Sequence, residues 1–161
     1  QKEINPSLKV AVIDLDVHQG NGTAAILQND DSIFTLSMHG ENNFPFKKEQ
    51  SDLDVGLADG CNDEVYLRSL STALAQLDSR FKADCLIFLA GADPHEGDRL
   101  GRLEISKDGM RLRDEMVFQY ALDRQLPIAF SMAGGYGKEI ESTVDIHFQT
   151  IKTALQFQKQ Y

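Results

Sequence analysis

Apolar residues are grouped along the chain into four short runs, separated by longer segments in which they recur every three or four positions. The runs occupy residues 9–15, 32–38, 85–90 and 127–133. Each is rich in Val, Ile, Leu or Phe, and none alternates regularly with polar residues. This pattern is typical of strands that are buried on both faces, as in a parallel sheet.

Helical periodicity fills most of the remaining chain. One helix is predicted from an N-cap at Asn62 or Asp63 to about Arg80, and a second follows an N-cap at Ser106 and ends before Pro127. A third is expected over about residues 138–158, and a shorter one follows Gly22. The apolar positions expected to form their buried faces are Val65, Leu67, Leu70, Leu74 and Leu77; Met110, Leu112, Met116, Val117, Tyr120 and Ala121; and Ile140, Val144, Ile151, Ala154, Leu155 and Phe157.

The alternation of strands and helices predicts an α/β fold with a mainly parallel sheet flanked by helices. Residues 42–60 are expected to be a long polar loop containing the isolated sequence Phe44-Pro45-Phe46. Loops of this length in a compact domain are often functional.

Composition narrows the class of protein. With 161 residues, 42% of them hydrophobic, the chain has about the length of one domain and enough apolar residues for a sizeable core. The net charge of −9 argues against a nucleic-acid partner, and no apolar stretch reaches the about 18 residues that would predict a membrane span. Cys61 and Cys85 form no CxxC motif, which excludes a zinc ribbon and a disulfide framework and favours a reducing compartment: the cytoplasm, or the nucleus in a eukaryote.

Polar residues follow each predicted strand, where ligands of parallel sheets bind. Asp14, Asp16 and His18 come at the end of the first run, and with a side-chain period of two they can point the same way. Asp93, after the third run, would complete an Asp-His-Asp set. Three protein ligands that leave a position for water and substrate are typical of a catalytic zinc site. A solvated strand end remains the alternative for the first motif taken alone.

The fourth run is followed by Gly134-Gly135-Tyr136-Gly137. The Tyr136 phenol could donate a hydrogen bond to an oxyanion, although a tyrosine on a surface turn is the simpler interpretation of this motif by itself. Neither a GxGxxG nor a GxxxxGK[ST] phosphate loop is present.

Three blocks together carry a family resemblance. IDLDVHQGNGTA at 13–24, AGADPHEGDRLG at 90–101 and GGYG at 134–137 resemble, in order and spacing, the zinc-dependent histone deacetylase family. The residues of the first two blocks are most similar to those of the class IV, deacetylase-11-like branch and its bacterial relatives. The resemblance implies the arginase/deacetylase-like fold and the hydrolysis of an acyl-lysine or a related acylated amine. A soluble α/β domain with coincidentally polar strand ends is improbable beside three matching blocks.

The resemblance also implies roles for single residues. Asp16, His18 and Asp93 match the zinc ligands, and Tyr136 matches the tyrosine that polarises the substrate carbonyl. Asp14 matches a carboxylate that orients an active-site histidine and helps to hold potassium. The other residues with an implied role are Ser37 and the Met38 carbonyl at the potassium site, Asn21 beside the second histidine, Phe44, Leu100, Gly134 and Gly135 around the acyl-lysine, and Asp98 and Gly101 as structural residues.

The paired histidines that act as general base in this family have no counterpart in the chain. They precede the DxDxH strand, and only eight residues lie before Lys9, the first of which is not Met. His39 has no neighbouring histidine, His95 is expected to support the pocket or face away, and His147 is expected to be an ordinary helix histidine. We therefore expect residues 1–161 to be the C-terminal portion of a single deacetylase-like catalytic domain. Its expected partners are the missing N-terminal portion and the acylated substrate, and it is expected to be inactive alone.

Two further functions remain open at this point. An arginase-like hydrolase with two manganese ions shares the DxH motif, but Gly20 stands where its additional Asp would be, and Asp93 begins no DxD motif. A non-catalytic acyl-lysine-binding protein would explain the absent histidines, but it would not need all three metal ligands and Tyr136.

Overall fold

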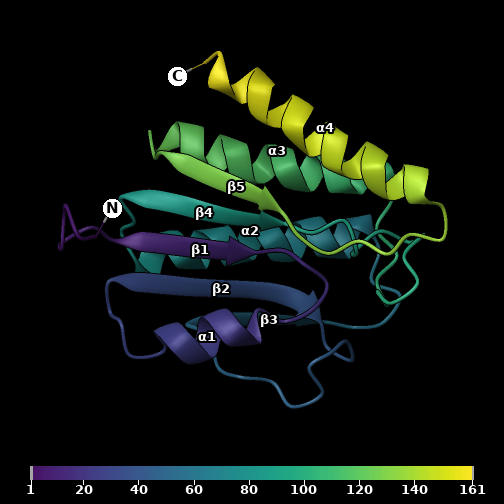
Figure 1. The fold of residues 1–161 in the computed structure, drawn as a ribbon, viewed down its shortest axis with the longest axis horizontal. Helices are drawn as coiled ribbons and strands as arrows, with labels where there is room; N and C mark the ends of the chain where they lie inside the picture. The colour runs from purple at the N-terminus through teal and green to yellow at the C-terminus, as the bar shows by residue number, and fades with distance from the viewer. Residues whose placement is uncertain (1, 161) are drawn as a thin grey trace.

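The computed structural model describes residues 2–160 and contains a five-stranded sheet with four helices. In chain order the elements are β1 (Val10–Asp14), α1 (Asn21–Leu27), β2 (Ile33–Gly40), β3 (Leu53–Leu57), α2 (Asp63–Arg80), β4 (Cys85–Ala90), α3 (Lys107–Asp123), β5 (Ile128–Met132) and α4 (Ile140–Gln158). All strand pairs are parallel and the strand order is β3-β2-β1-β4-β5 (Figure 1). The predicted fold class is therefore confirmed.

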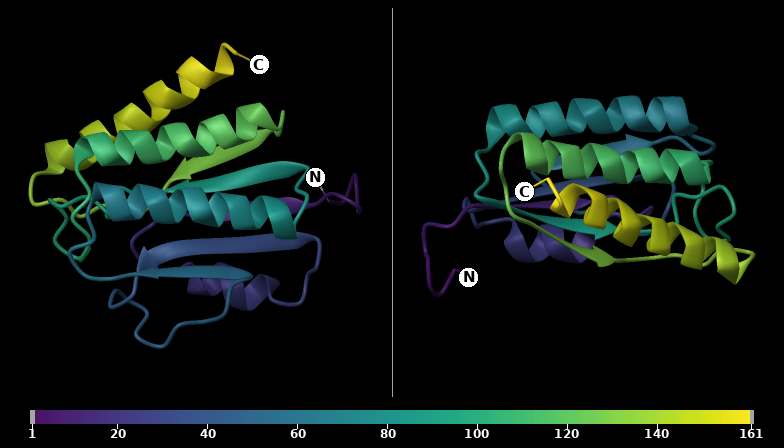
Figure 2. Two further views of the ribbon diagram at one scale, coloured as in Figure 1. Left: turned by 180° about the vertical axis from the view of Figure 1, so that it is seen from behind. Right: turned by 90° about the horizontal axis from the view of Figure 1, so that it is seen from above.

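The helices lie on both faces of the sheet. α1 lies on one face beside β2, whereas α2 and α3 cover the other, and α4 packs on α3 next to β5 (Figures 1 and 2). β1 is central and is buried along its whole length. The carboxyl ends of the strands meet at one edge of the sheet, where the loops that carry the polar motifs begin.

Sequence patterning located most elements to within two residues. Asn62 caps α2 by accepting a hydrogen bond from the amide of Val65, and Ser106 caps α3 by accepting one from the amide of Gly109. α1 begins at Asn21, slightly before the predicted position after Gly22. Side-chain capping therefore marks the starts of α2 and α3, whereas α1 has no side-chain cap.

The segment 42–60 is not a loop throughout, because it contains the strand β3, which pairs with β2. Leu53 and Val55 pack against the core, while Asp54 and Gly56 are exposed. A short edge strand with one exposed face alternates apolar and polar residues and so lacks the continuous apolar run that marks the other strands.

The expectation that all four apolar runs are buried on both faces holds for β1 and β2 and is wrong for β4 and β5. Ile87 in β4 is 41% exposed and Met132 in β5 is 60% exposed. The reason is that α1 packs against β2 and does not extend over β4 and β5 (Figure 1).

The predicted buried face of α2 needs a small correction. Val65 is exposed, whereas Tyr66 and Ala73 join Leu70 in the core, together with the predicted Leu74 and Leu77. The predicted face is thus correct except at its first position, where Tyr66 is buried in place of Val65. In α3, Leu112 and Met116 are only half-buried.

The buried face of α4 was predicted wrongly. Four of its predicted core residues are exposed, namely Ile140, Val144, Ile151 and Leu155, whereas its buried positions are Thr143, Ile146, Thr150 and Thr153. Ala154 and Phe157 are partly buried against the core, as expected. α4 thus turns a polar stripe towards α3 and leaves apolar side chains on its outer side. No helix in the described part of the chain combines the length and apolar character needed to span a membrane.

Candidate metal centre

The segment that follows β1 presents two polar side chains to one side. Leu15 and Val17 are fully buried, and they alternate with Asp16 and His18. The backbone of this segment is held from both neighbouring strands: the Leu15 amide donates to the Leu89 carbonyl, and the Val17 carbonyl accepts from the Gly40 amide. This alternation directs Asp16 and His18 away from the core.

Asp16, His18 and Asp93 converge at the sheet edge. Nδ1 of His18 lies 3.0 Å from Oδ1 of Asp16 and 3.2 Å from Oδ2 of Asp93, and the three candidate ligand atoms lie within 4.8 Å of one another. Asp93 is fully buried; its Oδ1 accepts from the Val17 amide at 2.9 Å, whereas its Oδ2 has no hydrogen-bond partner among residues 2–160. A buried carboxylate oxygen without a donor fits a metal ligand, because such a group is otherwise costly.

Electrostatics in the triad follow from this geometry. The hydrogen bond to Asp16 and the adjacent Asp93 carboxylate raise the pKa of His18 to about 10, despite partial burial. Burial raises the pKa of Asp93. Burial also opposes ionisation of Asp16, but hydrogen bonds from the His18 side chain and amide and from the Gly134 amide outweigh it and lower the pKa of Asp16. In the absence of a cation, a proton on His18 neutralises part of the carboxylate charge.

Gly134 closes the site from the loop after β5. Its amide donates to Oδ2 of Asp16 at 2.7 Å, and its carbonyl accepts from the Ala92 amide at 2.6 Å. A Cβ at this position would lie 2.1 Å from Oδ2 of Asp93 and 2.6 Å from Oδ2 of Asp16. Only glycine therefore lets this backbone approach both carboxylates.

Tyr136 lies two residues further along the same loop, with its side chain 56% exposed. Its backbone is fixed by Asp98, whose Oδ2 accepts from the Tyr136 amide at 2.6 Å. Oδ1 of Asp98 accepts from the amides of Leu100 and Gly101 at 2.7 and 2.8 Å. Asp98 thus joins the two loops that follow β4 and β5. The structural role expected for Asp98 agrees with these contacts, and the catalytic role of Tyr136 stays a prediction.

The candidate potassium residues are neighbours across β1 and β2. Asp14 is paired in register with Ser37, and both are buried, as is Met38. The Ser37 hydroxyl lies 3.0 Å from Nδ1 of His39 and accepts from the Gly20 amide at 3.2 Å. Burial raises the pKa of Asp14 to about 7, an effect that a hydrogen bond from the Asp16 amide opposes. The potassium assignment itself stays a prediction.

The predicted substrate-lining residues lie on loops that one side chain connects. Nδ2 of the buried Asn43 donates to the Leu100 carbonyl at 2.8 Å, and its Oδ1 accepts from the Arg102 amide at 3.2 Å. Phe44 and Leu100 are both exposed, at 60% and 54%. Asn43 therefore holds the segment containing Phe44 beside the segment containing Leu100.

Comparison with known proteins decides the family. The histone deacetylase domain model matches residues 1–151. The chain belongs to the histone deacetylase family. It is 45% identical over 139 residues to an uncharacterised protein of the cyanobacterium Picosynechococcus, an alignment that covers 86% of this chain and 46% of that protein. It is 38% identical to histone deacetylase 2 of Arabidopsis thaliana, over 81% of this chain and 34% of the relative.

Among solved structures, acetylpolyamine aminohydrolase from Burkholderia pseudomallei has the same fold. The superposition has a TM-score of 0.76 at 23% identity, and it covers 90% of this chain and 44% of the aminohydrolase. The chain thus spans less than half the length of each of these three proteins.

Other residues with predicted roles occupy ordinary positions in the deacetylase fold. Asn21 begins α1, and its role beside an absent histidine stays a prediction. Nδ1 of the buried His95 accepts from the Gly97 amide at 3.0 Å, so His95 braces its own loop, as expected for a supporting residue. His147 is half-buried, and its Nε2 lies 3.6 Å from the position of a Cβ built on Gly135.

Three residues near the site were missed by sequence reasoning. The buried Gln19 accepts from the Glu49 amide at 2.9 Å and donates to the Glu49 carbonyl, which ties the β1 loop to the segment before β3. Nothing in the sequence distinguishes Gln19 or Asn43 from other loop residues. Arg113 could have been identified from the sequence, because it is a charged residue within the apolar stripe of α3, between Met110 and Val117.

Proposed function

We propose that this chain forms the metal-binding part of a zinc-dependent deacetylase that removes an acetyl or other acyl group from a lysine or a related amine. The observation that carries the proposal is the convergence of Asp16, His18 and Asp93 in a member of the histone deacetylase family. One relative is named a histone deacetylase and a structural neighbour is named an acetylpolyamine aminohydrolase. Both acyl-lysine and small acylated amines are therefore substrate classes to test. The residues of the motifs at 13–24 and 90–101 favour the class IV branch.

The donor set supports a single zinc ion. Two carboxylates and one imidazole leave coordination positions free for substrate and water, which is characteristic of catalytic zinc. A zinc ion held there would polarise a substrate carbonyl and make a bound water more acidic. Residues 2–160 contain one group of His, Cys, Asp and Glu side chains able to hold a metal, and Gly20 offers no further ligand where an arginase-like site would have one. These features favour zinc over the two-manganese alternative.

Tyr136 is the residue we assign to oxyanion stabilisation. Its phenol would donate a hydrogen bond to the carbonyl oxygen as negative charge develops there, an interaction that lowers the barrier when the donor is already in place. Asp98 fixes the Tyr136 amide, and Gly134 joins the same loop to Asp16, so the loop position is coupled to the metal ligands. The proton of the attacking water would be taken by a histidine outside these 161 residues.

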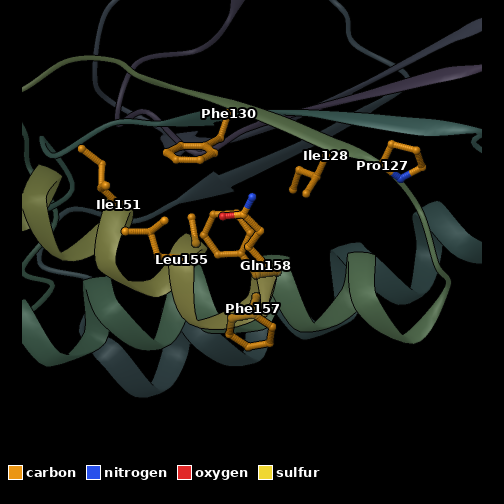
Figure 3. A pocket seen from close by; sticks show the side chains of 9 residues that line it. Pro127, Ile128, Phe130, Ile151, Leu155, Phe157 and Gln158 are labelled. Atoms are coloured by element: carbon orange, nitrogen blue, oxygen red, sulfur yellow. The ribbon is translucent and has the colours of Figure 1, made fainter. Parts of the chain in front are cut away.

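An uncovered apolar surface supports the existence of such an additional portion. Within residues 2–160, β5 pairs only with β4, and a groove of about 450 Å³ lies between β5 and α4, lined by Ile128, Phe130, Ile151 and Leu155 among others (Figure 3). The exposed apolar residues of α4 continue this surface. Since relatives are more than twice as long as the part aligned with this chain, we assign the surface to contact with the rest of the same protein.

The test compares this chain with a polypeptide extended to the length of its relatives. Both are loaded with Zn²⁺ and assayed with an acetyl-lysine peptide and with an acetylated polyamine. We expect one zinc per chain in both, and turnover in the longer polypeptide only. Turnover by the 161 residues alone would refute the argument that the general base is missing. A longer polypeptide with full zinc and no turnover would favour the non-catalytic binding protein.

A further inference from the structure

A buried ion pair interrupts the apolar face of α3. The side chain of Arg113 is fully buried and that of Asp114 is 1% exposed, between Met110 and Val117 of the same helix. Removing two charges from water costs free energy that their attraction does not always return. The contacts of the Arg113–Asp114 pair therefore indicate which structural role offsets the cost of burying it.

The guanidinium of Arg113 connects α3 to the loop that follows β4. Its Nη1 donates to the Gly91 carbonyl at 2.5 Å, and its Nε donates to Oδ1 of Asp114 at 2.8 Å. Oδ2 of Asp114 in turn accepts from the Thr150 hydroxyl on α4 at 2.6 Å. Three elements thus meet at one planar cation, whose orientation is fixed by Asp114 and Thr150 together.

Gly91 occupies a sensitive position. It directly follows β4 and lies two residues before the candidate ligand Asp93. A Cβ on Gly91 would lie 2.8 Å from Oδ1 of Asp93 and 2.8 Å from Cα of Asp16, so its backbone packs against both carboxylate-bearing residues. Because the peptide group is planar, a hydrogen bond to the Gly91 carbonyl also fixes the amide of Ala92. That amide donates to the Gly134 carbonyl in the loop that carries Tyr136.

We propose that Arg113 is a positioning residue for the metal centre, which holds the Gly91 carbonyl and thereby places Asp93 at ligand distance from Asp16 and His18. The inference rests on the proposed function, because it requires the triad to bind a metal. Asp114 and Thr150 act through Arg113 by fixing the plane of its guanidinium. Arg113 contacts neither substrate nor metal, so its effect is confined to the geometry and affinity of the site.

Substitution of Arg113 by lysine tests this role. A lysine keeps the charge but cannot donate to Gly91 and to Asp114 in the fixed geometry of a guanidinium. For Arg113→Lys we expect Zn²⁺ affinity, measured by chelator competition, to fall about 10–100-fold, the range for loss of an outer hydrogen bond to a metal site. The absorption spectrum of the Co²⁺-substituted protein should change as well, since it reports coordination geometry. Thr150→Val should weaken binding in the same direction by a smaller factor.

The matched control is Arg111→Lys. Arg111 lies on the same helix and pairs with Asp108 and Glu115 near the surface, so the variant should keep both the affinity and the Co²⁺ spectrum. Unfolding of each metal-free variant in urea separates lost stability from lost metal affinity. If Arg113→Lys does not fold, Thr150→Val alone decides the question.

The outcomes separate the two hypotheses. A wild-type chain that binds no Zn²⁺ overturns the proposed metal site, and the role of Arg113 with it. A wild-type chain that binds Zn²⁺, beside a folded Arg113→Lys variant of equal affinity and unchanged Co²⁺ spectrum, overturns only the role of Arg113. If Arg113→Lys does not fold, a Thr150→Val variant that binds Zn²⁺ as tightly as the wild type likewise overturns only the role of Arg113.

Discussion

Asp14 provides a quantitative test of the electrostatics at the end of β1. Burial, reinforced by the nearby carboxylates of Asp16 and Asp93, raises its pKa from 3.8 to about 7, although the Asp16 amide donates a hydrogen bond to it. The folded chain therefore binds this proton more tightly than the unfolded chain. The stability that Asp14 contributes is fully present below about pH 4 and is lost as the pH rises through about 7.

The size of the effect follows from the two pKa values. A change from 3.8 to about 7, at about 1.4 kcal/mol per pH unit, lowers the free energy of unfolding by up to about 4 kcal/mol between pH 4 and pH 8. Asp14→Asn removes the ionisation but keeps the shape and an oxygen that can accept from the Asp16 amide. We expect the variant to match the wild type near pH 4 and to exceed its stability by up to about 4 kcal/mol at pH 8.

Urea unfolding of the metal-free chain from pH 4 to pH 8, in potassium-free buffer with a chelator, measures this difference. The control is Asp31→Asn, the same change at an exposed carboxylate outside the site. Parallel stability curves for wild type and Asp14→Asn would refute the reasoning. If potassium binds beside Asp14 and Ser37, added KCl at pH 8 should stabilise the wild type more than choline chloride does. It should have no such effect on Asp14→Asn.

Three other predictions concern the metal site and Tyr136. The pKa of metal-free His18 is about 10, so a Zn²⁺ ion that binds His18 must displace a proton. The measured affinity of the chain for Zn²⁺ should therefore rise about tenfold per pH unit from pH 7 to 9. A Zn²⁺ affinity that is constant over this range would contradict the ligand role of His18. Gly134→Ala should abolish Zn²⁺ binding, as followed by chelator competition, because its Cβ would overlap the Asp93 carboxylate, whereas Gly22→Ala has open space and should bind normally. In the longer polypeptide, Tyr136→Phe should lower kcat by about 10²–10³-fold in a deacetylation assay, and an unchanged kcat would exclude Tyr136 from the chemistry.

The parts of the site that could be predicted from sequence depend on local rules. A strand fixes the direction of side chains two residues apart, so the spacing of Asp16 and His18 is enough to place them on the same side. The convergence of strand ends in a parallel sheet then brings in Asp93 and the loop of Tyr136. No comparable rule applies to Asn43 or Gln19, whose contacts join loops far apart in the sequence.

Arg113 shows a different limit of sequence reasoning. Its place between Met110 and Val117 marks it as buried, but its acceptor is a backbone carbonyl, and a carbonyl has no sequence signature. β3 was missed for a related reason, since its alternating pattern at the sheet edge resembles that of a polar loop. In both cases the deciding interaction is made by the backbone of a distant segment.

The errors at β5 and α4 have a common origin under the proposed function. Apolar residues in a strand or helix match the surroundings that they have in the complete protein. The exposure of Met132 and Val144 is that of the 161-residue chain alone. A sequence pattern that predicts burial and a structure that leaves the same residues exposed are compatible if another part of the protein covers them. Under the proposed function, an additional portion would supply the general base and would also cover the exposed apolar surface of β5 and α4. If the same portion does both, amides of β5 that exchange hydrogen rapidly in this chain should be protected in the longer, active polypeptide.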